Sequence, residues 1–184
     1  MTDDDIPLTG TTLIVGPLRA GKTRMTAAVL KRWLDEYGPS GVVVIDTAPE
    51  IESDEGLIGG RLDRFIDVPS AVFYGAVATS GPRAEGSSSE ESRRIAKENA
   101  ERARMLIESA PPTPRAVFVN DVTLAFQYDP SAVDDIATYW QDAECVVINA
   151  YEGSAFDKDD PISKNERRAL ARLKQFADRV IDLG

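Results

Sequence analysis

Eight consecutive residues near the start of the chain have residue types and spacing that could bind phosphate. They are Gly16, Pro17, Leu18, Arg19, Ala20, Gly21, Lys22 and Thr23, and they match the pattern G-x-x-x-x-G-K-[ST] of a phosphate-binding loop. Glycines at these places let backbone N–H groups turn inward around a polyphosphate. Lys22 can then reach the β- and γ-phosphates, and the Thr23 hydroxyl can ligate Mg²⁺. The pattern therefore predicts a site for a nucleoside triphosphate, here ATP, with Mg²⁺.

The residues on either side of this loop predict the elements that position it. An apolar strand is expected at about Thr12–Val15, directly before the loop. A helical pattern follows from about Arg24 and ends near Gly38. The N-terminus of a helix carries a partial positive charge, which favours a bound phosphate.

Two aspartates end apolar strands and are candidates for holding Mg²⁺ across the site. Asp121 follows the buried-type strand Ala116–Asn120, and Asp46 ends the strand Val42–Asp46. Ligands of parallel sheets gather at the carboxyl ends of the strands. We therefore predict Asp121 as the metal-site acid, with Asp46 as the alternative.

The rest of the chain alternates short β-branched runs with helical patterns, which is typical of a parallel sheet covered on both faces. Further strands are expected at the following ranges: 71–77, 145–150 and 179–183. Further helices are expected from Ser88 to about Ala110, from Ser131 to Trp140, and from Ser163 to Phe176. The alternation predicts one domain over residues 1–184, an α/β protein folded as a three-layer α/β/α sandwich with a mostly parallel sheet of five or six strands.

Local signals mark the starts of two of these helices and two loops. Ser88 with Glu91, and Ser163 with Glu166, have the spacing of capping boxes. Residues 79–89 are rich in glycine, serine and proline, and residues 52–64 contain three glycines, so we expect both stretches to be mobile without a ligand.

Composition limits the partners and the chemistry. The formal net charge is −10 and the chain contains no histidine, which argues against nucleic acid and anionic membranes as partners and excludes histidine bases and ligands. The single cysteine, Cys145, lies in an apolar run and is expected to be a buried thiol. No signal peptide and no apolar run long enough to span a membrane is recognisable. We expect a cytoplasmic protein.

On the loop Gly16–Thr23 and the strand that Asp121 follows, the chain resembles the P-loop NTPase superfamily, and within it the RecA-like branch. The resemblance implies a P-loop NTPase fold and places Asn149, at the end of the strand 145–150, where related ATPases contact the γ-phosphate. RecA-like ATPases usually follow the metal-site aspartate with a catalytic glutamate, whereas Val122 follows Asp121 here. The water-activating acid stays open between two alternatives. In the first, Asn120 takes the metal-site place and Asp121 activates the water. In the second, Glu50 or Glu52, four and six residues beyond Asp46, activates the water.

A second resemblance is to the ATP:corrinoid adenosyltransferases. It rests on the long helix that precedes the strand ending at Asp121 and on the sequence Ala125–Tyr128 after it. Asn120 and Asp121 stand where that family has two acidic residues, and the phosphate loop also departs from that family's pattern.

The sequence therefore favours Mg²⁺-dependent ATP binding with slow hydrolysis, coupled to loop movement, to an unknown protein partner or to self-association. One alternative is a nucleotidyl or adenosyl transferase, whose acceptor pocket we expect between residues 56–64 and 74–86. The other is a nucleotide-gated binding module that does not hydrolyse ATP.

Overall fold

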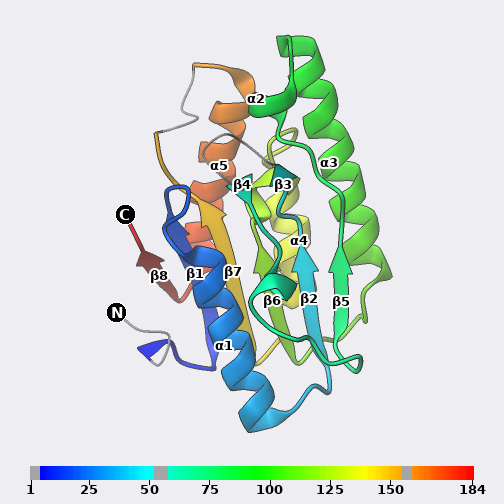
Figure 1. Cartoon of the computed structure of the whole chain (residues 1–184), viewed down its shortest axis with the longest axis vertical. Helices are drawn as coiled ribbons and strands as arrows, with labels where there is room; N and C mark the ends of the chain where they lie inside the picture. The colour runs from blue at the N-terminus through cyan, green and yellow to red at the C-terminus, as the bar shows by residue number, and fades with distance from the viewer. Residues whose placement is uncertain (1–4, 52–57, 155–158) are drawn as a thin grey trace.

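A six-stranded parallel sheet forms the centre of the computed structural model, which describes residues 5–51, 58–154 and 159–184 (Figure 1). The strand order is β5-β2-β6-β7-β1-β8, and every neighbouring pair is parallel. The strands are β1 (Gly10–Gly16), β2 (Val42–Asp46), β5 (Phe73–Ala76), β6 (Ala116–Asn120), β7 (Cys145–Tyr151) and β8 (Arg179–Asp182). A separate antiparallel pair consists of β3 (Glu50–Ile51) and β4 (Ile58–Gly59).

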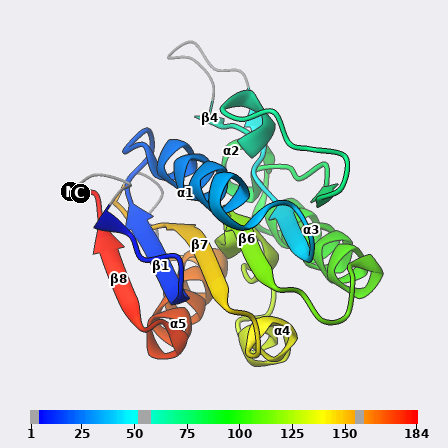
Figure 2. The ribbon, with the colours of Figure 1, turned by 90° about the horizontal axis from the view of Figure 1, so that it is seen from below.

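Helices cover both faces of the sheet, which confirms the three-layer α/β/α sandwich (Figure 2). One face carries α1 (Lys22–Tyr37). The other carries α3 (Ser89–Ser109), α4 (Ala132–Trp140) and α5 (Pro161–Phe176). Shorter helical segments are η2 (Leu62–Arg64), α2 (Pro82–Glu85) and η3 (Val122–Ala125).

Each face of the sheet has its own apolar core, because side chains of a strand alternate between faces. Ile14, Val44 and Phe118 are buried on the α1 side together with Trp33. Leu13 and its neighbours are buried on the side of α3, α4 and α5. All five residues of β2 and of β6 are buried, as expected for central parallel strands.

Most predicted elements are confirmed, with two local corrections. The helix predicted from Ser163 begins earlier, at Pro161, because the Asp160 carboxylate caps it by accepting from the N–H groups of Ile162 and Ser163 at 2.9 and 3.0 Å. The stretch 79–89, predicted as a loop, contains the short helix α2.

The other capping prediction holds in part. Ser88 Oγ accepts from the N–H of Glu91 at 3.1 Å, which is half of a capping box. The Glu91 carboxylate, however, accepts from the N–H of Ser87 at 3.0 Å and not from that of Ser88.

The phosphate-loop sequence begins at the carboxyl end of β1, between β7 and β8. β1 pairs with both neighbours over most of its length. Beyond β8, the N–H of Leu183 donates to the carbonyl of Val15 at 2.9 Å. In the described parts of the chain, no helix combines the length and the apolar character that a membrane crossing requires.

Candidate functional site

The loop after β1 has a backbone shaped to present N–H groups. Gly16, Arg19 and Gly21 have φ values of 152°, 61° and 92°. A side chain at Gly21 would be strained by this φ, although an added Cβ would meet no atom within 4 Å. Alternation of left- and right-handed residues turns successive N–H groups to one side, which makes a concave anion site.

The N-terminus of α1 is uncapped by any side chain, in contrast to α3 and α5. Gly21 is its N-cap and offers no side-chain acceptor, and its first turn contains no acidic residue. Ser88 and Asp160 fill this role for the other two helices. The helix α4 also lacks a side-chain cap, but Asp134 and Asp135 lie in its first turn, so the positive end of α1 is the helix end that best favours an external anion.

Lys22 lies along the inside of the loop. Its Nζ donates to the carbonyls of Gly16 and Pro17 at 2.9 and 2.6 Å and lies 5.9 Å from the centre of the Tyr151 ring. Burial lowers the pKa of the Lys22 ammonium, and the Asp121 carboxylate partly offsets this shift. The ammonium is thus held over the loop by its own carbonyls, and Asp121 is close enough to act on it electrostatically.

A cavity of about 360 Å³ joins this loop to the ends of β6 and β7. Its wall contains Leu18, Arg19, Ala20, Gly21, Lys22, Thr23, Arg24, Ala48, Phe65, Asp121, Asn149 and Tyr151. Six of the predicted loop residues, together with Asp121 and Asn149, are therefore brought together around one space.

Asp121 has a left-handed backbone, with φ 56° and ψ 49°. Its N–H donates to the Asn149 side-chain oxygen at 2.8 Å, and its carbonyl accepts from Thr47 Oγ1 at 2.9 Å. In the described part of the chain, Arg19 and Asp121 are the two non-glycine residues with positive φ, and both line this cavity. Such strain costs about 1–2 kcal/mol per residue and gathers at functional sites.

Asp46, the alternative metal-site acid, is fully buried and engaged in the protein. Its carboxylate accepts from the N–H groups of Leu62 (2.7 Å) and Ala48 (3.2 Å), from Tyr74 Oη (2.8 Å) and from Asn120 Nδ2 (2.8 Å). Burial nevertheless raises the pKa of Asp46, although these four hydrogen bonds oppose it. Asp46 does not line the cavity at the loop.

Asn120 and Asn149 continue the hydrogen bonding of Asp46 toward α1. Asn149 Nδ2 donates to Asn120 Oδ1 at 2.8 Å and to Thr26 Oγ1 at 2.9 Å. Thr26 Oγ1 donates in turn to the carbonyl of Lys22 at 3.0 Å. Both Asn149 amide hydrogens are thus used inside the protein, although the residue lines the cavity where contact with a γ-phosphate was expected. Asn120, fully buried in this network, lines no part of the cavity.

Glu50, one candidate for the water-activating acid, belongs to β3 and pairs with arginines. Its carboxylate oxygens lie 2.9 Å from Arg64 Nη1 and 3.8 Å from Arg61 Nε. Glu50 does not line the cavity, and Glu52 falls outside the described residues. In the described structure, Asp121 is the carboxylate on the cavity wall.

Four residues of the cavity wall were not predicted as site residues: Arg24, Ala48, Phe65 and Tyr151. Tyr151 directly follows the predicted strand 145–150, so the same strand-end signal that selected Asn149 could have found it. Ala48 and Phe65 come from the chain beyond β2, and no signal in the sequence indicates them. Phe65 is 51% exposed, which is unusual for a large apolar ring.

The donor set suits a metal that shares its ligands with phosphate. The described residues contain no group of three or more aspartate, glutamate, cysteine or histidine side chains able to hold an ion. Mg²⁺ in nucleotide sites commonly uses one or two protein oxygens and completes its shell with phosphates and water. Thr23 and Asp121, which both line this cavity, fit that use.

The comparisons with known proteins give little beyond this geometry. No protein-family model and no curated protein matches the chain. Among solved structures, the chain is similar to the Pif1 helicase of Candida albicans, with 12% identity and a TM-score of 0.42. The match covers 95% of this chain and 36% of that chain. With identity and TM-score this low, the function has to be argued from the site.

Proposed function

We propose that this protein binds ATP with Mg²⁺ at the loop Gly16–Thr23 and hydrolyses it slowly. The observation that carries the proposal is the uncapped N-terminus of α1, whose loop, lysine and facing aspartate line one cavity. A helix end with free N–H groups and a positive partial charge is suited to phosphate. The cavity volume of about 360 Å³ lies in the range of small-ligand sites.

Each residue of the cavity has a distinct role in this proposal. The loop N–H groups and Lys22 bind the phosphates, and Lys22 moves from the carbonyls of Gly16 and Pro17 toward them. Thr23 and Asp121 hold Mg²⁺ or its water. When bound, Mg²⁺ neutralises the phosphate charge and orients the leaving group.

We expect slow hydrolysis because the described cavity wall contains one carboxylate for two roles, holding the metal and activating water. Asp121 is the acid on the described cavity wall, so it cannot both hold the metal and serve fully as the base. Glu50 is paired with Arg64. An activating partner, or a second copy of the chain, would raise the rate by supplying an arginine, which can be worth about 10³-fold or more.

The released products provide the test. Purified protein with radiolabelled ATP and Mg²⁺ should bind the nucleotide and release orthophosphate at fewer than about one turnover per second. Release of triphosphate would instead indicate adenosyl transfer, and tight binding without product would indicate a binding module. No binding at millimolar ATP would refute the proposed site. Rapid turnover by a monomer in which Glu50 and Glu52 are both replaced by glutamine would contradict the account of slow hydrolysis.

A further inference from the structure

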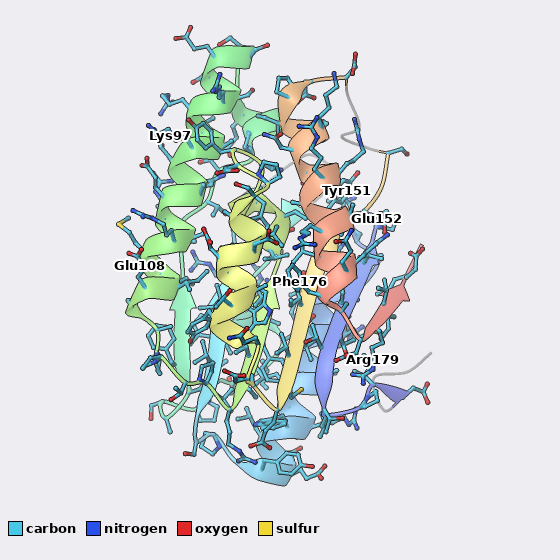
Figure 3. The ribbon with its side chains drawn as sticks, turned by 180° about the vertical axis from the view of Figure 1, so that it is seen from behind. Lys97, Glu108, Tyr151, Glu152, Phe176 and Arg179 are labelled. Carbon is cyan, nitrogen blue, oxygen red and sulfur yellow. The ribbon has the colours of Figure 1, made fainter. Side chains whose placement is uncertain are left out.

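A second and larger cavity, of about 800 Å³, lies on the other side of the sheet, between the N-terminal ends of α3 and α5. Figure 3 looks onto this side, with α3 and α5 flanking α4. Three stretches of the chain line the cavity: the start of α3, the pair Gln127 and Tyr128, and the start of α5. It shares no lining residue with the cavity at the phosphate loop.

Gln127 lines this cavity and has a buried amide with one unused acceptor. The side chain is 1% exposed, and its Nε2 donates to Glu166 Oε1 at 2.9 Å. That bond fixes the orientation of the amide, because the reversed amide would bring oxygen against a carboxylate. The Oε1 atom has no hydrogen-bond partner in the described structure. A buried polar atom without a partner destabilises the protein, and a ligand that brings a donor would relieve this.

Asn165, another residue of this wall, fixes the backbone at Gln127 and Tyr128 through its side-chain amide. Its Nδ2 donates to the carbonyls of Gln127 and Tyr128, at 3.0 Å each. Both amide hydrogens are therefore used, and the Oδ1 is the group that remains to interact with a ligand.

Tyr128 and Arg93 provide a flat surface at this cavity. The Arg93 guanidinium lies 5.7 Å from the centre of the Tyr128 ring. Planar groups of this kind pack well against the face of a ring-shaped ligand. Serine side chains complete the wall: Ser87, Ser88, Ser89 and Ser92.

The charges of the wall disfavour an anion. Glu90 and Asp160 line the cavity with one cation, Arg93. Ser88 Oγ already accepts from the N–H of Glu91 at the start of α3, and the Asp160 carboxylate accepts from those of Ile162 and Ser163 at the start of α5. The cavity therefore lacks the free helix end and the excess positive charge that phosphate sites use.

We propose that this cavity binds an uncharged ring ligand rich in hydroxyl groups, a saccharide or the sugar of an uncharged nucleoside. Its hydroxyl hydrogens would be donated to Gln127 and Asn165, its hydroxyl oxygens would accept from Ser88, Ser89 and Ser92, and its ring would pack on Tyr128. The proposal is independent of ATP binding, because the two cavities have no wall residue in common.

Titration of the full chain, with saturating Mg-ATP present, tests this proposal. The probes are methyl β-glucoside and maltose for the saccharide source, adenosine for the nucleoside source, and glucose 6-phosphate as the anionic comparison. We expect at least one neutral probe to bind with a Kd of about 1 mM or tighter. Glucose 6-phosphate should bind more weakly than the glucoside.

Two variants locate the binding. Tyr128→Ala should weaken it about tenfold, which corresponds to the loss of one ring contact, and Tyr37→Ala, at the distant end of α1, should not. Arg93→Ala, an exposed position, is the second variant in case Tyr128→Ala does not fold. Mg-ATP affinity should be equal in all of them. The proposal is wrong if no neutral probe binds, if the phosphate binds best, or if neither wall variant changes the affinity.

Discussion

The backbone N–H of Asp121 donates to the side-chain Oδ1 of Asn149 at 2.8 Å, across the ends of two neighbouring strands. The left-handed backbone of Asp121 is thereby held by a residue that is itself fixed to Asn120 and Thr26. Asn149 thus positions the predicted metal-site acid by its oxygen, while its amide hydrogens connect that acid to α1. Contact of Asn149 with a γ-phosphate stays a prediction, and the structure adds that its side chain fixes the backbone of Asp121.

Lys22→Ala should weaken binding of Mg-ATP about 10- to 100-fold, because charge-assisted hydrogen bonds to phosphate contribute about 1.5–3 kcal/mol. The fold should survive, since the lost bonds are to two loop carbonyls. Calorimetry with Mg²⁺ measures the affinity. Lys31→Ala, on the same helix and paired with Asp35, is the matched control and should bind ATP normally. Equal affinity in Lys22→Ala and the wild type would exclude the loop as the nucleotide site.

Asp121→Asn should lower turnover about 100-fold or more while ATP affinity changes only a few-fold. Asparagine also tolerates the left-handed conformation, so the substitution removes charge without adding backbone strain. Single-turnover assays with labelled ATP give the rate, and Asp129→Asn, exposed in the next loop, is the control. Asp46→Asn should impair turnover less. A larger loss of turnover in Asp46→Asn than in Asp121→Asn would show that Asp46, and not Asp121, is the metal-site acid.

Arg19→Gly should raise the free energy of unfolding by about 1 kcal/mol, because glycine adopts a φ of 61° without the strain that arginine has there. Lys31→Gly, in the interior of α1, should have the opposite effect by a similar amount. Urea unfolding measures both. If Arg19→Gly is less stable than the wild type, the side chain of Arg19 makes a stabilising contact that outweighs the strain.

Asp46→Asn should change the pH dependence of stability in a direction unusual for an aspartate. The pKa of folded Asp46 is raised by burial, so its contribution is full below the unfolded pKa and is lost as pH rises through the folded pKa. The free energy of unfolding of the wild type, relative to the variant, should therefore be larger at pH 4 than at pH 8. Urea titrations across this range measure it.

Glu144→Gln is the control of opposite sign. The hydrogen bond from Arg115 lowers the pKa of Glu144, so the stability that this residue provides is present above its unfolded pKa and lost as pH falls.

The opposite result for Asp46 would contradict its prediction. If the free energy of unfolding of the wild type, relative to Asp46→Asn, grows with pH, the four hydrogen bonds to Asp46 outweigh the effect of burial on its pKa.

The elements with a strong local signal were predictable from the sequence. Two strands, Val42–Asp46 and Ala116–Asn120, have the predicted bounds because their apolar runs are bounded by polar or turn residues. The position of the loop Gly16–Thr23 between a strand and a helix was also predictable, because its pattern depends on residues adjacent in sequence. The start of α5 was misplaced although Asp160 followed by Pro161 is itself a helix-start signal.

The surroundings of the site depend on the order of strands, which local patterns do not specify. Asp46 and Asn120 each end a strand and were both candidates for the metal. The pairing of β2 with β6 places these two residues side by side, and Asn120 Nδ2 then donates to the Asp46 carboxylate. The contribution of Phe65 to the cavity likewise depends on how the chain beyond β2 folds back.

The place of β1 in the sheet sets the order in which the phosphate loop can be completed during synthesis. β1 is the first strand to leave the ribosome, yet its two neighbours, β7 and β8, are among the last. At about 5–20 residues per second, the loop is made many seconds before either strand arrives to support it. If the loop binds ATP as proposed, the nascent chain should lack nucleotide affinity until β8 pairs with β1, and ATP would be a ligand of the finished sheet and not a template for its folding.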